Sequence, residues 1–164
     1  GLREIGLART EELEVTCWIE LDALLQRHAA LNAARHPEAQ RETPRLSREL
    51  LGLLPHEMPR SLGAAAAWPD GFNLLRMLDL LDSRREVRVD PAYPAGRRSA
   101  RLSFALADVL AQVHDSESGS GAGGRAPESQ PVAALLQEVL EAVSTSDRLR
   151  LVLRGLRDAR ERLS

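Results

Sequence analysis

Apolar residues are densest from residue 72 to residue 81, where seven of the ten positions are apolar. The polar ones, Asn73, Arg76 and Asp79, recur at every third position and therefore share one narrow stripe of a helix. A helix that is apolar around most of its girth has to be buried on several sides. The pattern predicts a helix over 71–84 as the central element of the fold.

The apolar period falls to two directly after this helix, which indicates a short strand over 86–90. Residues 90–98 are rich in turn formers, and apolar residues alternate again from Ala100 to Leu106. Residues 99–114 also satisfy helical spacing, so one continuous helix stays open as the alternative. We favour a strand followed by a helix, because residues 86–90 otherwise lack a partner for their backbone hydrogen bonds.

Other segments show the three- and four-residue spacing of amphipathic helices. Segment 115–130, which precedes the last two of these helices, has no aliphatic side chain larger than Ala and is predicted to be a flexible linker. The Ser144–Ser146 triplet interrupts the register and is expected to cap the last helix. The expected helices are 10–36, 44–54, 60–68, 131–143 and 147–163.

The element order over 44–106 is helix, helix, helix, strand, turn, strand, which is similar to a winged-helix domain. The resemblance rests on element order alone and makes 90–98 the wing. The expected fold is mainly α with a small β-hairpin, and the alternative is an all-α bundle. Residues 1–114 would form the core, and the helical pair in 131–164 would pack on that same core.

Composition narrows the possible chemistry. All 22 basic side chains are Arg, so a Walker-type phosphate loop, a Schiff-base enzyme and a Ser–Lys dyad lack the lysine they need. Cys17 is the only cysteine, which leaves neither an internal disulfide nor a thiolate zinc cluster. Cys17 and His28 lie on the apolar stripe of the first helix, where structural packing explains both better than metal binding or nucleophilic catalysis does. We expect no cofactor and no metal.

Charge is distributed unevenly along the chain. The middle block, residues 44–105, carries ten Arg against seven acids, or about +3, although the net charge of the whole chain is −2. A hairpin would gather six arginines that could contact phosphate groups: Arg84, Arg85, Arg88, Arg97, Arg98 and Arg101. A solvated strand face is the simpler interpretation of this cluster.

The last helix carries a narrow apolar seam beside a stripe of arginines, as in a helix that packs along one partner helix. The helix before it is about one turn too short to cover the seam, so the remainder should dock on the N-terminal helices or on a second chain. The candidate docking residues are Leu149, Val152, Leu156, Leu163, Arg150, Arg154 and Arg157.

These patterns favour a non-enzymatic assembly module that scaffolds or recruits another protein. The alternative is a nucleic-acid-associated subunit that contacts the phosphate backbone through the Arg-rich hairpin. No apolar run reaches the roughly 18 residues of a membrane span, and the N-terminus does not resemble a signal peptide. We therefore expect an intracellular protein, cytoplasmic or nuclear, with a protein partner and no membrane.

Overall fold

The computed structural model describes residues 2–35, 46–55, 57–87, 90, 92–118 and 129–163. These residues are mostly helical and contain no strand. The elements are α1 (Leu2–Arg35), α2 (Arg48–Gly52), the 3-10 turn η1 (Arg60–Leu62), α3 (Leu74–Ser83), α4 (Ala95–Ser118), α5 (Ser129–Glu141) and α6 (Thr145–Arg162).

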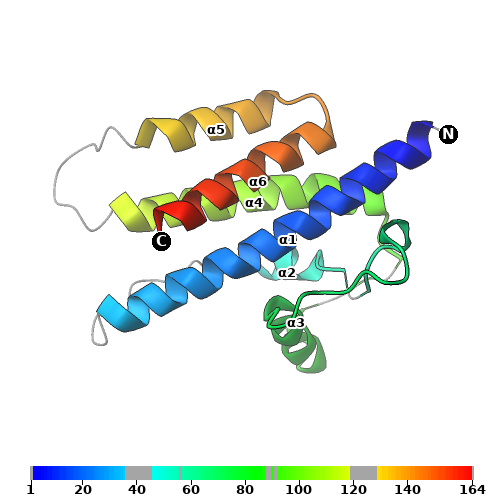
Figure 1. Ribbon diagram of the computed structural model, residues 1–164, viewed down its shortest axis with the longest axis horizontal. Helices are drawn as coiled ribbons and strands as arrows, with labels where there is room; N and C mark the ends of the chain where they lie inside the picture. The colour runs from blue at the N-terminus through cyan, green and yellow to red at the C-terminus, as the bar shows by residue number, and fades with distance from the viewer. Residues whose placement is uncertain are drawn as a thin grey trace.

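Four of the helices, α1, α4, α5 and α6, form a bundle (Figure 1). Helices α1 and α6 run parallel, since the hydroxyl groups of Thr10 and Ser146 lie 2.9 Å apart and Arg27 Nε donates to the Leu163 carbonyl at 3.2 Å. Helix α4 runs in the same direction, and α5 returns antiparallel along α6. The parallel arrangement requires long connections, and the α2–α3 segment makes one of them.

Helix α6 is the central element, because its contacts with α1, α4 and α5 are the most extensive in the bundle. The Ser144 side chain accepts a hydrogen bond from the Asp147 N–H and caps its first turn, which confirms the predicted cap, although the helix begins at Thr145 rather than at residue 147. Gly155 lets the neighbouring helices approach closely: a Cβ there would lie 2.6 Å from Leu135 Cδ2 and 2.7 Å from Leu110 Cδ1.

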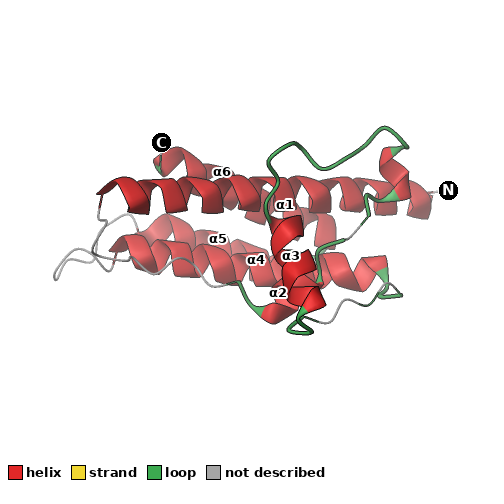
Figure 2. Cartoon of the chain, turned by 90° about the horizontal axis from the view of Figure 1, so that it is seen from below, coloured by secondary structure: helices red, strands yellow, loops and turns green. Residues whose placement is uncertain are grey.

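Helices α2 and α3 lie across the bundle as a small outer layer (Figure 2). Asp22 of α1 joins this layer to the bundle, because its Oδ1 accepts hydrogen bonds from the backbone N–H groups of Asn73 and Leu74 at 3.2 Å each. A side chain of one helix thus satisfies the free donors at the start of another. Burial raises the pKa of the Asp22 carboxyl above its ordinary value, although these hydrogen bonds oppose the shift.

The predicted β-hairpin and the winged-helix unit over 44–106 are wrong. Residues 99–114 belong to α4, the alternative that we did not favour. The helical face carries Leu102, Leu106 and Val109, all of them buried, whereas Phe104, which a strand would align with the first two, is 44% exposed. Residues 99–114 satisfy their backbone hydrogen bonds within α4, and Glu86 and Val87, the first residues of the predicted strand 86–90, belong to no strand.

The predicted central position of the 71–84 helix is also wrong. Helix α3 buries only Leu74 and Leu78, while Met77 and Leu80 are 43% and 51% exposed. The interior of the predicted linker, residues 119–128, lies outside the described residues. No helix in the described part of the chain has both the length and the hydropathy that crossing a bilayer requires.

Candidate functional site: a groove between α2 and α4

The arginines of the predicted hairpin are divided between two helices. Arg84 and Arg85 follow the end of α3, whereas Arg97, Arg98 and Arg101 lie in the first two turns of α4. Arg88 lies outside the described residues. Because the described residues of this segment form no strand, the phosphate-contact hypothesis loses the element that was to bring these side chains together.

One of these arginines points into the bundle. Arg98 Nε lies 2.6 Å from Oε1 of Glu14, whose side chain is fully buried, and the Ser99 hydroxyl donates to Glu14 Oε2 at 3.0 Å. Burial raises the pKa of the Glu14 carboxyl, and the hydrogen bonds and charge of Arg98 only partly offset this effect. This buried group joins α1 to α4 and is not available to an external ligand.

The predicted docking seam of the last helix is likewise used within the chain. Leu149, Val152 and Leu156 are fully buried in the core shared with α1 and α4, and Leu163 is half-buried. The buried part of the seam therefore packs on helices of its own chain, which is one of the two arrangements that the sequence left open.

The arginines beside that seam pair with acids of the same chain. Arg154 meets Glu138 of α5 at 3.0 Å, and Arg157 meets Glu20 of α1 at 3.5 Å. Arg150 pairs with Asp147 within α6 at 3.2 Å. The first two contacts link α6 to α5 and to α1, whereas the Arg150 pair lies within α6.

Cys17 is a packing residue. Its Sγ donates to the Leu149 carbonyl at 3.6 Å, and burial raises the pKa of the thiol to about 12. A thiol with that pKa stays protonated at neutral pH and is a poor nucleophile. The described residues also contain no group of three or more His, Cys, Asp or Glu that could hold a metal ion.

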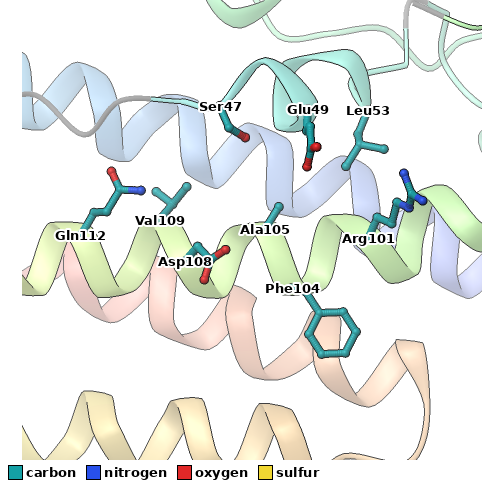
Figure 3. A pocket seen from close by; sticks show the side chains of 9 residues that line it. All are labelled: Ser47, Glu49, Leu53, Arg101, Phe104, Ala105, Asp108, Val109 and Gln112. Carbon is teal, nitrogen blue, oxygen red and sulfur yellow. The ribbon is translucent and has the colours of Figure 1, made fainter.

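A groove of about 420 Å³ lies between α2 and α4 (Figure 3). The outer face of α4 forms its floor with Ala105 and Val109, and Leu53 stands on the α2 side. Phe104 points away from α2 and forms the opposite edge. The full lining is Ser47, Glu49, Leu53, Arg101, Phe104, Ala105, Asp108, Val109 and Gln112.

A cation of α6 covers one side of the Phe104 ring. The Arg148 guanidinium carbon lies 4.9 Å from the ring centroid, and the same side chain donates to Ser103, Ala142 and Thr145. This cation–π contact leaves part of the ring exposed. The groove therefore has a large, partly exposed apolar edge.

The acidic groups of the groove are unpaired within the described residues. Glu49 points from α2 toward α4, and both Glu49 and Asp108 are exposed without a hydrogen bond or ion pair (Figure 3). At one end, the guanidinium of Arg101 lies over the Tyr93 ring, 5.7 Å from its centroid. Apolar contact area and unpaired charge therefore occur together on this face.

Arg101 is the one groove residue that the sequence had marked as a candidate. Phe104 could have pointed to the groove, because it is a large aromatic residue on the polar face of α4. This signal emerges only when 99–114 is taken as a helix. Glu49 and Leu53 reach the site through tertiary packing, which the periodicity of α2 alone does not show.

Comparisons with known proteins give no further guide to this site. No family model matches the chain, and neither a curated protein nor a solved structure shows a significant match.

Proposed function

We propose that the chain is a non-enzymatic protein-interaction module that receives a segment of a partner protein in the groove between α2 and α4. The observation that carries this proposal is the combination of a 44% exposed Phe104, packed against the Arg148 guanidinium, with an apolar floor and unpaired acids. Exposed aromatic side chains beside an apolar floor are typical anchors of protein interfaces.

The shape of the groove favours a protein segment over a small molecule. Small-molecule sites enclose most of the ligand surface in a cavity. Here six of the nine lining residues are exposed, so the site is open along α4. An open strip of this kind provides contact area for one face of a helix.

The use of the buried ionisable groups supports the non-enzymatic part of the proposal. Glu14, Asp22 and Cys17 each hold a contact between helices, and Glu20 holds two arginines of α6. A perturbed pKa is informative about catalysis when the group faces a cleft. Glu14 and Cys17 instead face the interior of the bundle.

Site-specific crosslinking tests the proposal. A photoreactive phenylalanine derivative replaces Gln112 in the groove and, as the control, Asp82 on α3, in cells that naturally produce the protein. We expect a crosslinked partner from position 112, none from position 82, and loss of the product when Phe104→Ala is added. Equal crosslinking at both positions, or a product unaffected by Phe104→Ala, would contradict the proposal. Circular dichroism melts of the variants establish that the bundle is intact.

A further inference from the structure

The charges along the floor of the groove follow a defined order. Arg101, Phe104 and Asp108 lie on one face of α4, because a separation of seven residues corresponds to about two helical turns and about 10 Å. Glu49 adds a second carboxylate from α2, which faces the middle of the groove near Ala105. Along α4 the chemistry thus changes from basic through apolar to acidic.

From this order we infer that the occupant is an amphipathic helix of a partner protein, with an acidic end over Arg101, an apolar residue at Phe104, and a basic end over Asp108. The inference rests on the proposed function and adds the chemistry and direction of the bound segment. Complementary charges select the partner and fix its register more than they raise affinity.

A helix fits the site better than an extended segment. The groove is built from helices, whose backbone hydrogen bonds are satisfied internally, so it offers no open strand edge to an extended peptide. A helix satisfies its own backbone groups and repeats its face every seven residues, the separation between Arg101 and Asp108. Side chains of such a helix therefore meet both ends of the floor.

The direction of the bound helix follows from its dipole. Acidic residues stabilise the first turn of a helix, and basic residues stabilise its last turn. A partner helix charged in that way places its N-terminus at Arg101 and its C-terminus at Asp108. It therefore lies parallel to α4, as α1 and α6 do on the inner side of the bundle.

Two designed peptides test the inference on the full chain. Both are about 15 residues long, because shorter isolated helices are marginal in water. Both carry the same leucine stripe; the forward peptide has Glu in its first turn and Arg in its last, and the reversed peptide exchanges these charges. We expect fluorescence anisotropy at low salt to show the forward peptide binding about threefold to tenfold more tightly, with the difference shrinking at high salt.

Charge-reversal variants test whether Arg101 and Asp108 cause the preference for the forward peptide. In the double variant Arg101→Glu with Asp108→Arg, the preference should invert toward the reversed peptide, whereas Asp82→Arg on α3 should leave it unchanged. Circular dichroism of each variant checks the fold, since all three side chains are exposed and their replacement leaves the core intact.

Three outcomes would overturn the inference: neither peptide binds, both bind equally, or the preference survives the double reversal. Dimerisation of the chain by sedimentation that Phe104→Ala abolishes would also overturn it, because the occupant would then be a second copy. If the crosslink at position 112 still depends on Phe104, the proposed function stands although the charge order is wrong. Loss of that crosslink refutes the proposed function independently of the peptides.

Discussion

Helices α3 and α6 show that apolar content and burial are different properties. The segment that contains α3 has seven apolar residues in ten, yet α3 buries only Leu74 and Leu78. Helix α6 carries six arginines and still buries six residues, because its apolar positions form one seam. The spacing of apolar residues, together with the helices available to cover them, therefore locates the centre of this fold better than their density does.

The polar contacts that join each region to α1 also differ. Helix α6 is joined to α1 by Glu20, which lies 3.5 Å from Arg157 Nε and 3.1 Å from Arg160 Nε. The α3 layer is joined to α1 through the Asp22 cap and through Gln26, which donates to the Gly71 carbonyl at 3.1 Å. We therefore expect damage to α6 to affect the whole bundle and damage to α3 to stay more local.

The largest expected effect is that of Leu156→Asp. Leu156 is fully buried on the α6 seam, so the new carboxylate would lie in the core without a partner. We expect a loss of more than about 4 kcal/mol in the free energy of unfolding, a large share of the roughly 5–15 kcal/mol of a typical domain. Urea denaturation followed by circular dichroism measures it, with Leu156→Met as the volume-matched control. A loss below about 1 kcal/mol would contradict the central place of α6.

Leu78→Asp should have a smaller and more local effect. Leu78 is also fully buried, but α3 packs on α2 and the edge of the bundle. From the density of apolar residues alone, the same change would unfold the whole domain. We now expect α3 amides to lose protection from hydrogen exchange while α6 amides keep most of theirs, because local openings need less free energy than global unfolding. Equal loss of protection in α3 and α6 would show that the two regions unfold as one unit.

The sequence predicted the parts of this structure that depend on helical spacing. The long first helix, the last helix and its Ser144 cap follow from local patterns, and each is present. Ala100–Leu106 fits alternation and helical spacing equally well, and tertiary packing decides between them. The groove was beyond prediction because it joins Leu53 and Ala105, which are distant in sequence and meet only after α2 folds back over α4.

The two regions are also distinguished by their buried carboxylates. Asp22 caps the α3 layer through neutral backbone donors, whereas Glu14 faces the charged Arg98 inside the bundle. Burial nevertheless raises the pKa of Glu14 above its ordinary value of 4.5. The folded protein therefore holds this proton more tightly than the unfolded chain, and ionisation of Glu14 costs more in the folded state.

The smallest expected effect is a pH-dependent one, seen by comparing the native chain with Glu14→Gln. The native contribution of Glu14 is fully present below pH 4.5 and falls as pH rises through the folded pKa, whereas Gln does not titrate. The unfolding free energy of the native chain minus that of Glu14→Gln should therefore decline as pH increases above 4.5. Urea titrations at a series of pH values measure this difference, and Glu12→Gln controls for losing an exposed carboxylate from the same helix. A difference that grows with pH would mean that Arg98 outweighs burial, and the α1–α4 contact would then act as a stabilising ion pair.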